Sequence, residues 1–164
     1  MADKSWEQIS KELRRPFPAR AIGYKPGVIT KDGLKALAFP YVDPRAVVER
    51  LDEVAGREWE FRFKVLSDNP KLWIVQGTLT ILGITREDVG EGTPNSPTNN
   101  ENVSKGAVSD SLKRAAVLFG VGAYIYKMPQ VWLPYDAQKK KFSEEYPYDR
   151  AIKAMMSKAT EVKA

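Results

Sequence analysis

The chain has 164 residues, 43% of them hydrophobic, which is enough for one domain-sized hydrophobic core. It contains 26 Lys and Arg against 21 Asp and Glu, so its net charge is +5, a balance that favours an acidic partner without naming one. The sequence has neither cysteine nor histidine, which excludes disulfides and thiolate metal sites and removes the commonest general base, so we expect no cofactor and no enzyme.

The stretch KSWEQISKELRRP predicts a short amphipathic helix near the N-terminus. Ser5 and Gln8 have the spacing of a capping box, and Pro16 ends the helical pattern. No apolar leader precedes this helix, and no apolar run in the sequence approaches membrane-spanning length. We therefore expect a cytoplasmic protein without a membrane partner.

Glycine-punctuated chain follows and predicts short strands at residues 19–24 and 34–42. Asp43 and Pro44 then provide an N-cap and a first helical residue, and Gly56 provides a C-terminal signal. A second helix is expected between these signals. Its apolar face consists of Val47, Val48, Leu51 and Val54.

Two long strands come next and predict an antiparallel hairpin. In REWEFRFKVL, aromatic and apolar residues alternate with charged ones, so one face is buried and the other is solvated. After the turn SDNPK, the stretch LWIVQGTLTILGITRE predicts the second strand, with Gly77 and Gly83 as candidate bulges. Residues 88–102, rich in Gly, Pro, Asn, Ser and Thr, predict a loop.

A long helix is predicted at residues 103–123. On a wheel of about 100° per residue, Lys113 and Arg114 lie opposite an apolar face that we expect to pack on the sheet. That face consists of Val108, Leu112, Ala115, Ala116 and Phe119. Residues 149–164 predict a last helix or the start of a flexible tail. The element order predicts the α+β class, an antiparallel sheet with a long helix packed on it, in one domain spanning residues 1–148.

The basic pair Lys113–Arg114 has two interpretations. As solvated surface, Arg114 forms an i, i+4 ion pair with Asp110, which stabilises a helix by about 0.2–0.5 kcal/mol. As a binding surface, the pair joins other cations whose spread suits a phosphate backbone, where affinity comes from summed charge. Those cations include Lys25, Lys31, Lys35, Arg45, Arg57, Arg62, Lys64 and Lys105.

The motif VSKGAVSDSLKRAAVLFGVGAYIY is similar to the signature helix of the Rad-fifty-two/twenty-two family of single-strand annealing proteins. The matching positions are Asp110, Leu112, Lys113, Arg114, Ala115, Phe119 and Gly120. Three further stretches resemble the family in the same order: LRRPFPARAIGYK, PRAVVERLDEVAGREWEF and REDVGEG. The resemblance covers residues 5–136.

The resemblance implies a β-β-β-α core whose subunits form a ring, a homo-oligomer that binds single-stranded DNA. It implies ATP-independent strand annealing and protection of DNA ends in double-strand break repair, at the nucleoid and with other repair proteins as partners. The DNA backbone would lie in a basic groove with its bases free to pair. Lys113 and Arg114 match the groove floor, Arg45 matches the groove wall, and Lys105 matches a further basic position.

The sequence departs from the family pattern at two places. Val117 stands where eukaryotic members place a third arginine, and Gly56 and Arg57 replace an aromatic residue after the short helix. We therefore expect DNA contact to be weaker there or to be relocated to Arg57, Arg62 or Lys64. Aromatic residues at strand spacing, such as Trp59, Phe61 and Phe63, are expected in the core. The candidates for stacking on bases are Tyr24, Tyr124 and Tyr126.

Three rival functions stay open at the level of sequence. Glu87, Asp88 and Glu91 could hold Mg²⁺ in a nuclease, although acidic residues are common at strand ends. A protein–protein adaptor could use the basic surface to meet an acidic partner. RNA could replace DNA, because backbone contacts discriminate poorly between the two. The sequence has no Walker-type nucleotide-binding loop, which favours an ATP-independent binding protein.

Overall fold

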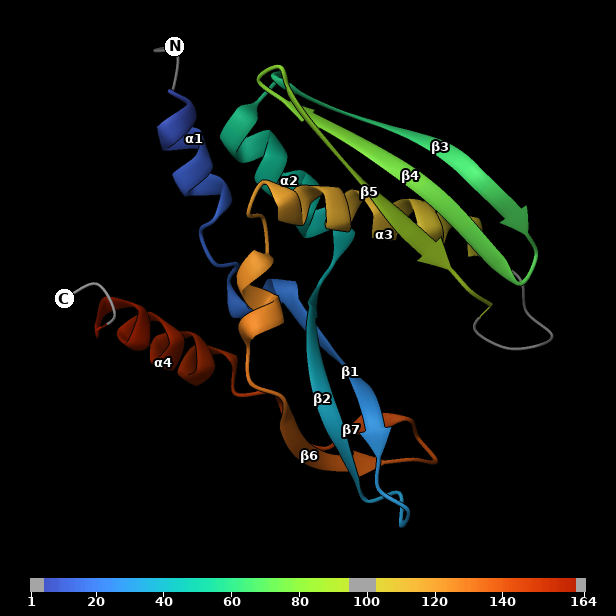
Figure 1. Ribbon diagram of the computed structural model, residues 1–164. Coiled ribbons are helices and arrows are strands. Elements are labelled where there is room, and N and C mark those ends of the chain that lie inside the picture. The colour runs from blue at the N-terminus through green and yellow to red at the C-terminus, as the bar shows by residue number, and fades with distance from the viewer. Residues whose placement is uncertain (1–4, 95–102, 162–164) are drawn as a thin grey trace. The chain divides into compact units, whose positions relative to one another are not determined.

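The computed structural model describes residues 5–94 and 103–161, and the chain divides into two compact units. Unit 1 consists of Met1–Arg15 and Pro44–Ala123, and unit 2 consists of Pro16–Asp43 and Tyr124–Ala164. Each unit is built around its own antiparallel sheet (Figure 1). Helices accompany both sheets, so the predicted α+β class with antiparallel sheets is confirmed.

Two of the helices of unit 1 are α1 (Trp6–Leu13) and α2 (Pro44–Ala55). The predicted capping box of α1 is present. Ser5 Oγ accepts a hydrogen bond from the Gln8 backbone N–H at 3.3 Å, and Gln8 Oε1 accepts one from the Ser5 N–H at 2.9 Å. α2 ends directly before Gly56, as its terminal signal predicts.

The sheet of unit 1 is a meander of β3 (Trp59–Asn69), β4 (Leu72–Ile81) and β5 (Ile84–Gly92). The prediction of a single second strand is wrong, because the chain turns back sharply at Leu82 and Gly83. Their φ angles of 46° and 74° are those of a two-residue hairpin turn that matches the twist of the strands.

Two other strand predictions also need correction. Gly77 pairs regularly with both neighbouring strands, and the bulge lies instead between Val65 and Ser67. Residues 88–92, predicted as loop, form the end of β5 because their backbone pairs with β4. The rest of the predicted loop to residue 102 is described only at residues 93 and 94, which belong to no strand.

Helix α3 (Val103–Leu118) packs on one face of this sheet, which gives the predicted β-β-β-α arrangement (Figure 1). It ends before residue 123, because Gly120 has a φ of 95° and the chain continues as a short 3-10 helix, η2 (Ala123–Lys127). Val108 is only partly buried, contrary to the wheel. The buried residues of α3 are Val103, Ala107, Ser111, Leu112, Ala115 and Ala116.

Strand β3 is an edge strand that α3 leaves partly uncovered. Phe61, Phe63 and Val65 point to the α3 side of the sheet, because their cross-strand partners on β4 are buried under that helix. Phe63 is nevertheless 54% exposed and Val65 40% exposed, so the prediction that this strand face lies in the core is wrong at these positions. The physical reason is that α3 contacts mainly β4 and β5.

Unit 2 contains a short 3-10 helix, η1 (Ala19–Ala21), and helix α4 (Tyr148–Glu161). Its sheet has the strand order β1 (Ile22–Ile29), β2 (Lys35–Val42), β6 (Val131–Asp136) and β7 (Lys141–Phe142). The last two strands were not predicted, because prolines and aromatic residues interrupt the alternation of apolar and polar residues that indicates a strand. The core of the unit consists of Ala38, Met128, Leu133, Tyr146, Tyr148 and Ala151.

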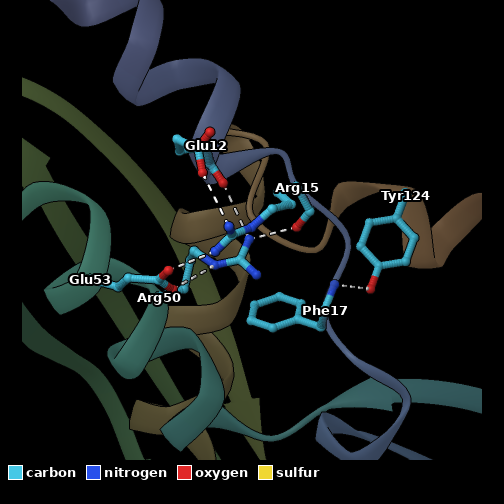
Figure 2. Close-up of polar contacts among 6 residues, drawn as sticks. All are labelled: Glu12, Arg15, Phe17, Arg50, Glu53 and Tyr124. Carbon is cyan, nitrogen blue, oxygen red and sulfur yellow. Dashed lines mark hydrogen bonds and ion pairs between the residues drawn. The ribbon is translucent and has the colours of Figure 1, made fainter. Parts of the chain in front are cut away.

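A cycle of hydrogen bonds within unit 2 joins Phe17 to two tyrosines. The Phe17 backbone N–H donates to Tyr124 Oη at 3.0 Å (Figure 2). The hydroxyls of Tyr124 and Tyr148 lie 2.6 Å apart, and Tyr148 O–H donates to the Phe17 carbonyl at 2.7 Å. The directions are consistent if Tyr124 donates to Tyr148, so each group in the cycle is paired.

Tyr148→Phe is expected to lower the free energy of unfolding by about 1–2 kcal/mol, because it removes the hydroxyl that pairs with both the Phe17 carbonyl and Tyr124. Urea unfolding measures the change. Tyr126→Phe is the matched control, because Tyr126 is 72% exposed and should change stability very little. Equal losses in the two variants would contradict the role of the cycle.

Candidate nucleic-acid interface

The predicted basic pair lies on α3, which packs against β4 and β5 of the unit 1 sheet. Arg114 and Lys105 are exposed, and Lys113 is partly exposed. At about 100° per residue, Lys113 is about 80° from Lys105 and about 100° from Arg114 around the helix. Lys113 therefore stands between the other two cations, which lie on opposite flanks of α3.

Arg114 also contacts the sheet. Its Nε lies 3.3 Å from Asp88 Oδ1 on β5, and the Arg114 side chain stays 46% exposed. Asp110, the partner predicted for Arg114, accepts a hydrogen bond at 3.2 Å from the backbone N–H of Glu91. Both carboxylates thus tie α3 to β5. A half-exposed ion pair of this kind contributes at most about 1 kcal/mol, and it leaves much of the guanidinium accessible.

Arg62 and Lys64 lie on the other face of the same sheet. Arg62 pairs in register with Thr78 and Lys64 with Gln76, whereas the alternate residues of β3 face α3. Both cations are exposed, and Arg62 forms an ion pair with Glu60 at 3.2 Å. The sheet therefore separates these two cations from the basic residues of α3, and the predicted set does not form one continuous patch.

Arg45 and Arg57 lie at opposite ends of α2. Arg45 is in its first turn and Arg57 follows its last residue, and both side chains are exposed. The helix has 12 residues, so at 1.5 Å per residue the two ends are about 18 Å apart. These arginines can contact separate phosphates of a nucleic-acid strand that passes along α2, but they cannot both bind the same phosphate.

The three carboxylates of the nuclease alternative do not converge. Glu87 lies on the face away from α3 and accepts hydrogen bonds at 2.8 Å from the side chains of Gln76 and Thr78. Asp88 lies on the α3 face with Arg114. Within residues 5–94 and 103–161 no group of three metal-ligating side chains is close enough to hold an ion. Because successive side chains of β5 point to opposite faces of the sheet, Glu87 and Asp88 cannot bind the same ion.

The described helices include none long and apolar enough to cross a membrane.

The sequence matches, over residues 5–143, the family described as Rad52/22 family double-strand break repair protein. The chain belongs to the Rad52/22 family. Two curated relatives are both named single-stranded DNA-binding protein DdrA, one from Deinococcus deserti and one from Deinococcus radiodurans. They are 43% and 39% identical to this chain over 132 residues, which is 80% of it.

The chain spans only part of these Rad52/22 relatives. The matched region covers 63% of the first relative and 61% of the second, so each extends well beyond what is matched here. The helix with Lys113 and Arg114 and the strand with Asp88 both lie inside the region that matches the family. The resemblance drawn from the four sequence stretches is therefore confirmed at the level of the family.

Proposed function

We propose that this Rad52/22 family member binds single-stranded DNA without ATP, anneals complementary strands and protects DNA ends during double-strand break repair. The observation that carries the proposal is family membership together with the name of the two relatives, single-stranded DNA-binding protein. In this proposal residues 1–148 form the DNA-binding and oligomerisation domain, located at the nucleoid, with single-stranded DNA and further copies of the chain as partners.

The exposed cations of unit 1 would hold the phosphate backbone. Lys105, Lys113 and Arg114 on α3 are the main contacts in this proposal, because a packed helix presents them in fixed positions. Arg45, Arg57, Arg62 and Lys64 add charge at other points of the unit. Contact through phosphates leaves base edges free for pairing, and pairing of complementary strands is itself favourable, so no nucleotide hydrolysis is needed.

An oligomeric ring is supported by the apolar edge of β3. Phe63, Val65 and Leu66 are 54%, 40% and 50% exposed, and all three belong to the edge strand of the unit 1 sheet. An exposed edge strand with apolar side chains favours association with another chain. A second copy that covers this edge would extend the basic surface from one subunit to the next.

The first test is binding of a fluorescent oligonucleotide, single-stranded against duplex, across a salt series, with the mass of the assembly measured in the same samples. The proposal predicts a preference for the single strand, a large oligomer and affinity that falls steeply with salt. Annealing of complementary oligonucleotides, measured without ATP, tests the proposed annealing activity. A monomer that ignores DNA would overturn the proposal, and Mg²⁺-dependent loss of the label would favour the nuclease.

Lys113→Ala combined with Arg114→Ala is expected to weaken single-strand binding by tenfold or more, as about two phosphate contacts are lost. The slope of log affinity against log salt should fall by about 1.4, which is about 0.7 for each contact to a single strand. Arg150→Ala with Lys153→Ala removes the same charge from the exposed side of α4 and is the matched control. Equal affinities for the two double variants would refute the assignment to α3.

A further inference from the structure

The sheet of unit 2 has an outward face that the core does not use. Ala36 and Ala38 on β2 are buried, and Ala38 belongs to the core with Leu133 of β6. The alternate residues of β2 point to the other side, together with their neighbours on β1 and β6. This aromatic face carries Phe39, Tyr41 and Trp132, with Lys25 and Lys35 beside them.

Two rings of the aromatic face lie over glycines. A Cβ built on Gly23 would be 2.6 Å from Cζ of Tyr41, and a Cβ on Gly27 would be 2.2 Å from Cε2 of Phe39. Any larger residue at either glycine would collide with the ring opposite it. Glycine in β1 thus lets each ring rest on the strand backbone, in the way that aromatic residues cover glycines of a sheet edge.

The rings of this face are accessible although they are large. Tyr41 is 40% exposed and Trp132 is 48% exposed, and Phe39 is partly exposed. Trp132 is the direct cross-strand partner of Leu37, two residues before Phe39. Tyr41 is four residues from Leu37 along β2, so it is about 14 Å from Trp132, with Phe39 midway. A single strand stretched to about 7 Å per base, twice the 3.4 Å rise of one strand in a duplex, covers that distance in about two nucleotides.

The charge of the face complements a phosphate chain. Lys25 is the cross-strand partner of Phe39, and Lys35 is that of Pro134, two residues after Trp132 on β6. The carboxylate on this side of β6 is Asp136, which accepts the backbone N–H groups of Gln138 and Lys139 at 3.0 and 2.9 Å. These bonds lower the pKa of Asp136, with the Lys139 N–H the largest cause, and they turn its charge toward the adjacent turn.

We propose that the aromatic face of unit 2 binds single-stranded nucleic acid by stacking bases on Tyr41 and Trp132, as a contact surface separate from the cations of α3. Lys25, beside Phe39, and Lys35, beyond Trp132, would neutralise phosphates near the stacked bases. Stacking occupies the faces of the bases and leaves their pairing edges open, which is compatible with strand annealing. This inference takes from the proposed function only the class of ligand, which is single-stranded nucleic acid.

The test compares an oligothymidine with an abasic oligonucleotide of equal length and equal phosphate count, both fluorescent, on the full chain. The wild type should bind the oligothymidine about tenfold more tightly than the abasic strand. Tyr41→Ala with Trp132→Ala should abolish this preference and leave abasic binding unchanged. Tyr41→Phe and Trp132→Phe keep a ring and should retain most of the preference. Tyr126→Ala is the control: this 72% exposed ring lies on η2, outside the aromatic face, and although the sequence also offered it for stacking, its loss should leave the preference unchanged.

Each other outcome overturns the inference. If the wild type binds both strands equally, bases do not contribute, and only this proposal fails. If the double variant loses affinity equally for both strands, or if it changes the mass of the assembly without changing base preference, the face serves folding or contact between copies. If the wild type binds neither strand, the proposed function fails as well. The Lys113→Ala, Arg114→Ala variant separates the two, because it should weaken binding of both strands alike.

Discussion

Gly90→Ala is expected to lower the free energy of unfolding by about 3 kcal/mol or more, the upper end of overpacking effects. A Cβ on Gly90 would be 2.1 Å from the backbone nitrogen of Ser111 and 2.5 Å from the carbonyl oxygen of Ala107. Both atoms belong to the backbone of α3, so no side chain can rotate away. The helix would have to move off the sheet, and chemical or thermal unfolding measures the cost.

Gly106→Ala is the matched control for this prediction. Gly106 lies in the same helix, and the nearest atom to its Cβ is 4.0 Å away, so the added methyl group fits. Alanine should raise stability there by about 0.5–1 kcal/mol, because glycine is the weaker helix former. The close-packing explanation fails if the two alanines change stability by similar amounts.

The close approach at Gly90 also determines the geometry of the proposed DNA contacts. On the same face of the sheet, a Cβ on Gly92 would be 2.0 Å from the carbonyl oxygen of Val103. Two residues before Gly90, Asp88 pairs with Arg114. An α3 helix displaced by Gly90→Ala would separate this ion pair and move the cations that we assign to the phosphate backbone. Weaker single-strand binding should therefore accompany the loss of stability.

The sequence predicted those elements whose signals are local. The capping box at Ser5, the helix after Pro44 and the alternation that begins at Trp59 all depend on residues a few positions apart. Gly90 and Gly92 were assigned to a loop, because a stretch rich in Gly, Pro, Asn, Ser and Thr is typical of loops. The structure uses them for the close approach of a helix to a strand, a role that depends on contacts with residues far along the chain.

The candidate interface was predictable in part for the same reason. A helical wheel places Lys113 and Arg114 away from the apolar face of α3, and the structure agrees. The ion pair of Arg114 with Asp88 depends on the pairing of α3 with β5, which no local pattern encodes. The outward rings of unit 2 had a local signal, because Phe39 and Tyr41 alternate in KALAFPYV. The same alternation is equally typical of a strand face buried in a core.

A buried arginine in unit 1 was not predicted either. Arg50 lies on the apolar side of α2 and is 4% exposed. Its Nη1 donates to the backbone carbonyls of Glu12 and Arg15 at 3.3 and 2.5 Å (Figure 2). These carbonyls lie at the C-terminal end of α1, which favours a positive charge, and the Glu12 carbonyl also accepts the Arg15 backbone N–H at 3.2 Å. Arg50 thereby fastens the C-terminal end of α1 to α2.

Arg50 is supported by a chain of exposed charges. Glu53 Oε2 is 3.8 Å from Arg50 Nε, and Glu53 Oε1 is 2.7 Å from Arg15 Nη2 (Figure 2). The hydrogen bond and the charge of Glu53 raise the pKa of Arg15 above its ordinary value, so the Arg15 guanidinium stays charged. Glu53 keeps Arg15 as a partner if Arg50 is removed, and at 60% exposure it also keeps water.

Arg50→Met is therefore expected to lower the free energy of unfolding by about 2–3 kcal/mol, because two carbonyls lose a charged donor while the volume of the side chain is kept. Arg50→Lys should cost less, since an ammonium keeps the positive charge and can still donate to at least one of these carbonyls. Arg57→Met removes an exposed arginine just beyond the same helix and should change stability by less than about 0.5 kcal/mol. Urea unfolding of the three variants measures these changes and separates the loss of hydrogen bonds to the α1 carbonyls from the loss of one positive charge. If Arg50→Met matched Arg57→Met, the hydrogen bonds of Arg50 to the Glu12 and Arg15 carbonyls would not contribute to stability, and the buried arginine would have no structural role.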